Sequence, residues 1–436
     1  MNWAESGWDS GLEYAVLSDI GLRRANNQDA YAVDVATSPS RWEGRGHLFL
    51  VADGMGAHAA GELASKMAAD YVPLAYTKQT ELTPPEALRA AIEEANDKIH
   101  SRGSANADFH GMGTTASSLV LLPQGAIVAH VGDSRVYRLR DGLLEQLTFD
   151  HSLVWEMMHS GHAGAAQAPS YLPKNIITRS LGPNADVQVD VEGPFPVQVG
   201  DRYLLCSDGL TGQVEDDELG MILASMSPTE AANALVDLAN LRGGPDNITL
   251  IVVEVRRLPA ASGHAGWAPV RHRPPERSPE ETVRRWQALF AAVGVALLLA
   301  GAAGLWWKQR LLAAAIIALA AAAGAIWLLL RWPRSESPRR PGPTTDVLLH
   351  GKGPYTSTRA APTREFVERL SDVVRQLRVA AQEEQWTIDW DHFDQLCRQA
   401  DTAVERQSYG PAVQATGQAI SFMMNELRSQ RTKQGD

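Results

Sequence analysis

HLFLVADGMG, residues 47–56, is an apolar run that ends in an Asp-Gly pair, and this pattern indicates how the rest of the chain folds. A short apolar run bounded by glycine is typical of a buried strand, which would hold Asp53 rigidly at its end. Gly54 lets the backbone turn sharply and leaves its carbonyl oxygen unshielded. A fixed carboxylate beside a free carbonyl offers two oxygen ligands to a hard cation.

The pattern recurs three times in the first 256 residues. Asp133 follows AIVAHVG, Asp208 follows RYLLCS, and Asp246 directly precedes NITLIVV. Any one of these aspartates alone is more often part of an ordinary turn. Four carboxylates at strand ends, however, would repel one another unless a divalent cation lay between them. The motifs contain no His or Cys ligand pair, so the sequence predicts a site for Mg²⁺ or Mn²⁺ and not for Zn²⁺.

Seven sequence motifs, in the order in which they follow one another along the chain, resemble those of the bacterial branch of the metal-dependent serine/threonine phosphatases of the 2C type. The resemblance extends from about residue 12 to residue 256. It implies an α+β fold, a four-layer α-β-β-α sandwich of two antiparallel sheets flanked by helices. The motifs are SDIGLRRANNQDA (18–30), VADGMGAHAAGELAS (51–65), GMGTTASSLVLL (111–122), VGDSRVYRLRDG (131–142), ITRSLG (177–182), GDRYLLCSDGL (200–210) and GPDNITLIVVEV (244–255).

The resemblance also implies the metal ligands. Asp53 would bridge two Mn²⁺ or Mg²⁺ ions, and the Gly54 carbonyl would bind the second ion. Asp208 and Asp246 would hold the first ion. Asp133, together with Asp208, would form a third and weaker metal site.

Four further residues receive roles from the same resemblance. Arg24 would grip the phosphate, since a guanidinium fork matches two phosphate oxygens. Asp29 would orient metal-bound water. Gln28 stands where many relatives carry a glutamate, and Asn247 would steady the last ligand loop. Met55 replaces the histidine that is proposed as general acid in eukaryotic relatives, so another group, such as metal-bound water, must protonate the leaving oxygen.

The implied reaction is hydrolysis of phosphoserine or phosphothreonine by metal-activated water. The partners would be phosphoproteins, including membrane serine/threonine kinases and their substrates. Two alternatives stay open: a signal-dedicated module that binds phosphoproteins, and a phosphatase that acts on an anti-sigma-factor antagonist. The complete aspartate set favours catalysis. A net charge of −11 argues against a nucleic-acid partner, because no basic stripe interrupts the first 255 residues.

The chain beyond residue 256 changes in character. Residues 257–285 are predicted to be a linker, and 286–332 contain two uncharged apolar runs, 288–307 and 311–330. Each run is long enough to cross the lipid bilayer, so the sequence predicts a transmembrane helical hairpin. Arginines flank its outer ends more densely than its loop. The predicted location is therefore the cell membrane, multi-pass, with the phosphatase domain (1–256) and the C-terminal domain both cytoplasmic.

The C-terminal region is predicted to be a second linker, 333–362, and a small all-α domain, 363–431. Three amphipathic helices are expected there, and a self-contained helical bundle fits them better than a single tetratricopeptide unit. DVLLHGKGPY (346–355) is unusually apolar for a linker. The two cysteines, Cys206 and Cys397, cannot form a disulfide framework, which favours a reducing compartment.

Overall fold

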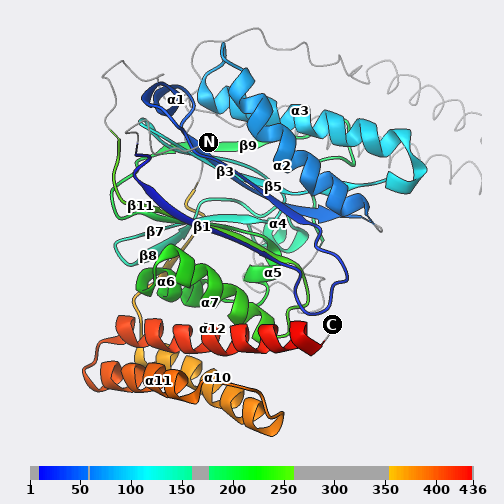
Figure 1. Ribbon diagram of the computed structural model, residues 1–436. Coiled ribbons are helices and arrows are strands. Elements are labelled where there is room, and N and C mark those ends of the chain that lie inside the picture. The colour runs from blue at the N-terminus through cyan, green and yellow to red at the C-terminus, as the bar shows by residue number, and fades with distance from the viewer. Residues whose placement is uncertain (1–8, 57–58, 160–175, 260–352, 435–436) are drawn as a thin grey trace, which may run out of the picture. The chain divides into compact units, whose positions relative to one another are not determined.

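The computed structural model describes residues 9–56, 59–159, 176–259 and 353–434, which form two antiparallel β-sheets and their covering helices (Figure 1). The first sheet has the order β1 (Leu12–Asp19), β11 (Ile248–Val255), β10 (Arg202–Cys206), β7 (Arg135–Arg140), β8 (Leu143–Gln146) and β12 (Thr356–Arg359). The second has the order β2 (Asp29–Asp34), β3 (His47–Met55), β5 (Ala116–Leu122), β6 (Gly125–Val131) and β9 (Asp190–Phe195), and β4 (Gly113–Thr114) pairs with β3.

Helices cover the outer face of each sheet. The second sheet carries α2 (Ala60–Lys78) and α3 (Pro84–Ala105), and the first carries α6 (Asp216–Ser225) and α7 (Pro228–Leu241). Between the sheets lies an apolar core to which β3 contributes Phe49 and Val51, and β11 contributes Ile251 and Val253. The predicted pair of antiparallel sheets flanked by helices is confirmed. Shorter helices are α1 (Pro39–Gly44), η2 (Ala107–Phe109), α4 (Leu153–His159) and α5 (Asp208–Thr211).

Local sequence signals account for where the long helices begin. The side chains of Thr83 and Glu86 form a capping box at the start of α3, and Ser227 and Glu230 form one at the start of α7. Each box satisfies backbone N–H groups that the first helical turn leaves without a partner, and a proline follows each cap at the first helical position. The buried face of α2 is made largely of alanine, which lets this helix approach β3 closely.

The chain crosses from one sheet to the other between β6 and β7. The spacing of apolar segments in residues 114–142 suggests a continuous antiparallel meander, and β5 and β6 do pair in that way. Strand β7, however, pairs with β8 and β10 in the opposite sheet. The connection is Gly132–Ser134, and Gly132 has a φ of +118°, a conformation that glycine adopts readily. Asp133 therefore lies at the passage between the two sheets.

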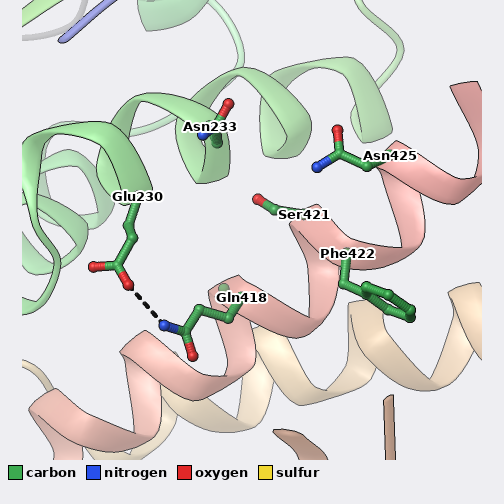
Figure 2. A pocket seen from close by; sticks show the side chains of 7 residues that line it. Glu230, Asn233, Gln418, Ser421, Phe422 and Asn425 are labelled. Carbon is green, nitrogen blue, oxygen red and sulfur yellow. Dashed lines mark hydrogen bonds between the residues drawn. The ribbon is translucent and has the colours of Figure 1, made fainter. Parts of the chain in front are cut away.

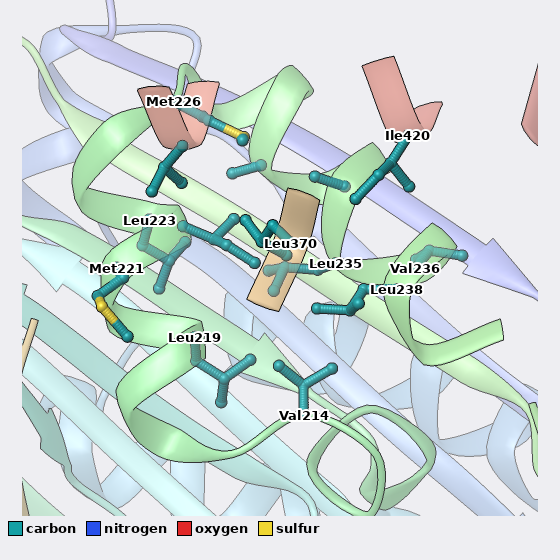
Figure 3. Packing of buried hydrophobic residues seen from close by; sticks show 14 of the residues in the cluster. Val214, Leu219, Met221, Leu223, Met226, Leu235, Val236, Leu238, Leu370 and Ile420 are labelled. Carbon is teal, nitrogen blue, oxygen red and sulfur yellow. The ribbon is translucent and has the colours of Figure 1, made fainter. Parts of the chain in front are cut away.

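Three C-terminal helices lie beyond α6 and α7: the last of them packs on α6 and α7, and the other two pack chiefly on the last one (Figure 1). They are α10 (Arg364–Glu383), α11 (Trp390–Glu405) and α12 (Tyr409–Gln434), where the sequence predicts three amphipathic helices. Their apolar side chains extend the hydrophobic core of the first sheet without a break. Figure 3 shows Leu370 and Ile420 among residues of α6 and α7 such as Leu235. The described residues from 9 to 259 and from 353 to 434 accordingly form one compact unit.

Polar contacts also join α12 to α7. Gln418 donates a hydrogen bond of 2.7 Å to Glu230, at the edge of a cavity of about 260 Å³ that Asn233, Ser421 and Asn425 also line (Figure 2). Deeper in the same interface, Arg428 forms a 2.7 Å ion pair with Asp237, whose side chain is 1% exposed. The C-terminal helices therefore neutralise a charge that the N-terminal region buries.

A strand was missed in the stretch that the sequence assigns to a linker. Strand β12 lies within residues 333–362 and pairs with β8 at the edge of the first sheet, with Thr356 opposite Gln146. Its run TSTR is short and polar, so it has little of the apolar character that identifies a strand in sequence.

The predicted transmembrane hairpin, 286–332, and the linker 257–285 after residue 259 lie outside the described residues. Among the helices that the structure does describe, none has the length and apolar character needed to span a bilayer.

Replacing Arg428 should show how far the C-terminal layer stabilises the whole unit. Arg428→Ala leaves Asp237 buried without its ion-pair partner, so we expect a loss of about 1–3 kcal/mol in the free energy of unfolding. Arg398→Ala is the matched control, because this arginine is exposed on α11. Urea unfolding of the purified chain measures both. Adding Asp237→Asn to Arg428→Ala should recover part of the loss; equal stability of the two arginine variants would contradict the stabilising role.

Candidate active site

Five aspartates lie where the ends of the two sheets meet. Asp53, near the end of β3, lies directly opposite Asp29 on β2. In the other sheet, Asp208 follows β10 and Asp246 precedes β11, the strand that pairs with β10. Asp133 lies on the connection between the sheets. The structure therefore gathers the four predicted metal-binding carboxylates and Asp29 in one place.

The carboxylates influence one another strongly. Asp53 is partly exposed to solvent. The surrounding protein nevertheless removes most water from its carboxylate, and this burial raises the pKa of Asp53 well above the ordinary value. The charges of Asp29 and Asp208 raise it further. Burial, followed by the charge of Asp208, raises the pKa of Asp133 to about 8. Burial raises the pKa of Asp29 to about 7, although hydrogen bonds from Ser207 and Thr249 oppose the shift. Like charges this close make each carboxylate harder to ionise.

The donor set fits a hard divalent cation. Oδ1 of Asp29 and Oδ1 of Asp133 are buried oxygens without a hydrogen-bond partner among the described residues. Buried carboxylate oxygens that repel one another are the ligands that Mg²⁺ and Mn²⁺ prefer. Within the described ranges, no three acidic, imidazole or thiolate groups stand at the spacing of an assembled metal site. The conclusion that these carboxylates suit Mg²⁺ or Mn²⁺ therefore rests on the chemistry of their oxygens and on their mutual repulsion.

Two glycines allow the ligand loops to approach each other. A Cβ atom on Gly209 would lie 1.9 Å from the carbonyl oxygen of Asn247, so only glycine can follow Asp208 at this position. A Cβ atom on Gly54 would lie 2.1 Å from the carbonyl oxygen of Gly61 and equally could not be accommodated. The Asp-Gly pairs of the sequence thus reflect close backbone packing at both strand ends.

Asn247 joins the last ligand loop to the loop that carries Arg24. Its Oδ1 accepts a 2.8 Å hydrogen bond from the backbone N–H of Gln28. Its Nδ2 donates to the carbonyl oxygens of Ile20 and Asn26, at 2.9 and 3.0 Å. One side chain therefore fixes three backbone groups of residues 20–28 beside Asp246.

The backbone carbonyl of Gln28 connects three segments of the site. Its carbonyl oxygen accepts hydrogen bonds from the N–H of Gly54, at 3.1 Å, and from the hydroxyl of Ser65, at 2.6 Å. These contacts tie the start of β2 to Gly54 in the last part of β3 and to the first turns of α2.

Arg24 lies at the mouth of the site. Its guanidinium donates a 2.6 Å hydrogen bond to Oδ2 of Asp246, and its side chain is 48% exposed. This pairing raises the pKa of Arg24, whose charge also interacts with Asp53 and Asp208. The predicted phosphate-binding residue is thus beside the carboxylates, and it is accessible from solvent.

Three hydroxyl side chains that the sequence analysis missed support the aspartates: Thr115 and Ser207 contact them directly, and Ser134 contacts Thr115. Thr115 Oγ1 accepts a 2.9 Å hydrogen bond from the N–H of Asp53, and it lies 2.8 Å from Ser134 Oγ. Ser207 Oγ donates a 2.8 Å bond to Oδ2 of Asp29. Ser134 follows Asp133 and Ser207 precedes Asp208, so their adjacency to predicted ligands was the available signal. Thr115 carries no such signal.

Removing one carboxylate should stabilise the protein when no metal is bound. We expect Asp53→Asn to raise the free energy of unfolding by roughly 1–2 kcal/mol in chelator, because one repelling charge is lost. The gain should be larger at pH 8 than at pH 5, since acid protonates the wild-type carboxylates whose pKa values are raised. Asp97→Asn, an exposed aspartate on α3, is the control. Thermal unfolding with and without Mn²⁺ provides the test; equal stabilisation of Asp53→Asn and wild type by Mn²⁺ would contradict the role of Asp53.

Comparison with known proteins assigns the chain to a family. The sequence profile of protein phosphatase 2C matches residues 23–239. The serine/threonine phosphatase stp of Listeria monocytogenes is 41% identical over 212 residues, 48% of this chain and 84% of that protein. Protein phosphatase PhpP of Streptococcus pneumoniae is 37% identical over 249 residues, 56% of this chain and 98% of that protein.

Solved structures match a similar share of the chain. The serine/threonine phosphatase of S. agalactiae is 35% identical, with a TM-score of 0.49, and the match covers 56% of this chain and 99% of that one. The catalytic domain of the phosphatase PstP, in complex with 2 manganese ions, is 34% identical, with a TM-score of 0.46 and coverage of 56% and 97%. By its sequence relatives, this chain belongs to the protein phosphatase 2C family, the metal-dependent serine/threonine phosphatases that hydrolyse phosphoric monoesters.

Proposed function

We propose that the aspartate cluster hydrolyses phosphoserine and phosphothreonine in proteins with two Mn²⁺ or Mg²⁺ ions, and that Asp133 adds a weaker third site. The observation that carries the proposal is the convergence of five aspartates from both sheets on one place, where four of them, Asp29, Asp53, Asp133 and Asp208, have raised pKa values. Asp53, Asp208 and Asp246, with the Gly54 carbonyl, would hold the two ions. When bound, such ions lower the pKa of water and polarise the phosphoryl oxygens.

The remaining polar residues would bind and orient the reactants. The exposed guanidinium of Arg24 can pair with two oxygens of a phosphate dianion, and its contact with Asp246 keeps it beside the carboxylates. Asp29 is held by Ser207 and keeps Oδ1 without a partner among the described residues, so it would accept a proton from water and fix its orientation.

The thiols are unsuited to act as the nucleophile. Cys206 is fully buried on β10, and burial raises the pKa of its thiol above the ordinary value. Cys397 lies on α11 in the C-terminal layer, and burial raises its pKa as well. A nucleophilic cysteine requires the opposite shift, which supports direct attack by water.

The membrane is the proposed place of action. The two apolar runs at 288–307 and 311–330 support a transmembrane hairpin, and the arginines outside it support a cytoplasmic position for the phosphatase and the C-terminal region. Attachment to the bilayer raises the effective concentration of the enzyme near membrane phosphoproteins. Membrane serine/threonine kinases and their substrates are therefore the substrate class that we propose.

The metal-dependent reaction is tested directly by hydrolysis of p-nitrophenyl phosphate and of a phosphothreonine peptide. We expect activity with Mn²⁺, no activity with excess chelator, and no effect of thiol alkylation. Asp208→Asn should lower kcat at least about 100-fold, since it removes charge stabilisation from the reacting centre. Asp97→Asn should retain wild-type activity. Full hydrolysis in chelator would contradict the metal-dependent reaction.

The proposed topology is tested with reporter fusions in cells. Fusions at residue 260 and at residue 436 should both report the cytoplasm, and a fusion at Gln309 should report the opposite side, because the basic flanks lie on the outer ends of the two runs. Opposite compartments for residues 260 and 436 would show that only one run spans the membrane.

A further inference from the structure

The C-terminal segment joins the first sheet at its edge, where β12 pairs with β8. The N–H of Tyr355 donates a 2.9 Å hydrogen bond to the carbonyl oxygen of Gln146 and so begins the pairing of β12 with β8. The Tyr355 hydroxyl is hydrogen-bonded to Glu192 on β9, and the N–H of Gly353 donates to the same carboxylate at 3.2 Å. Because β8 and β9 belong to different sheets, the residues around Tyr355 link the two sheets at this point.

Tyr355 also completes an aromatic cluster. Its ring packs edge-on against Phe149, with the ring centroids 5.3 Å apart. Phe149 in turn contacts Trp155 of α4 at 6.0 Å and His151 at 6.3 Å. The pairs of Phe149 with Tyr355 and with Trp155 are edge-to-face, a favourable arrangement that restricts the rings, and the pair with His151 is tilted at 49°. Phe149 is therefore fixed between the C-terminal segment and His151.

His151 holds the backbone next to Asp133 in two ways. Its N–H donates a 2.7 Å hydrogen bond to the carbonyl oxygen of Gly132, and its ring Nδ1 accepts a 3.0 Å bond from the N–H of the same glycine. The other ring nitrogen lies 3.1 Å from Oδ2 of Asp190, so the imidazole is held from both sides. The Gly132 backbone sets where the adjacent Asp133 carboxylate lies.

We propose that Tyr355 is a positioning residue for the active site: through Phe149 and His151 it fixes the Gly132–Asp133 backbone. The inference rests on the proposed role of Asp133 as a metal ligand. Tyr355 lies beyond the residues matched by the family profile, 23–239, and so this contact comes from the C-terminal region of this chain. The C-terminal segment would thereby set the geometry of a ligand that the phosphatase region itself supplies.

The test compares three variants of the full chain. Tyr355→Leu removes the ring and the hydroxyl, Tyr355→Phe keeps the ring, and Arg359→Gln changes an exposed residue on β12, the strand that follows Tyr355. Hydrogen exchange of the amides of Gly132 and His151, measured in chelator, reports the backbone contact without any metal. We expect about tenfold faster exchange in Tyr355→Leu, a smaller change in Tyr355→Phe and none in Arg359→Gln.

Activity measurements then separate the inference from the proposed function. With p-nitrophenyl phosphate, Tyr355→Leu should need more Mn²⁺ for half-maximal activity, and Tyr355→Phe should restore most of the wild-type dependence. Exchange and Mn²⁺ dependence equal to those of Arg359→Gln, with only a lower Tm, would overturn the positioning role. A wild-type chain without Mn²⁺-dependent activity would instead overturn the proposed function, while faster exchange in Tyr355→Leu would still support the backbone contact.

Discussion

The crowding of carboxylates in a place largely withdrawn from water is the constraint on which the rest of the structure depends. Asp29, Asp53, Asp133 and Asp208 all have raised pKa values, which means that ionising them in this environment costs free energy. A flexible scaffold would relieve that cost by letting the side chains move apart. Here two sheets, joined by an apolar core, hold them together at their common end. The stability of the sandwich thus supports an arrangement that is unfavourable by itself.

The rigidity of the site comes from its small and polar neighbours. Asn247 gathers three backbone groups, Thr115 fixes the backbone at Asp53, and glycine at two positions lets the loops approach to a distance that no side chain allows. Arg24 offsets part of the negative charge from the exposed side. These groups contact the segments that carry the aspartates and not the apolar core. Loss of one should therefore change the positions of the aspartates more than it changes the fold.

The sequence predicts the paired sheets and the aspartates that the structure brings together, because both depend on local patterns. An apolar run that ends in Asp-Gly identifies Asp53 and Asp208 without any knowledge of the fold. Contacts between distant segments leave no such signal, which is why Thr115 and the crossing of β7 into the other sheet were missed. Strand β12 was missed for a different reason: TSTR is polar on both faces, and it becomes a strand only because β8 offers it an edge.

The place of β12 has a mechanical consequence. The chain leaves the first sheet at the end of β11 and returns to that same sheet at β12, so residues 260–352 are joined at both ends to one compact unit. A domain that is connected to a membrane anchor by a single linker can rotate in any direction about its point of attachment. A domain attached at two separate points loses part of that rotational freedom. If the intervening stretch spans the bilayer as proposed, the catalytic face would therefore sample a restricted set of orientations toward the membrane, set by the spacing of the two attachment points.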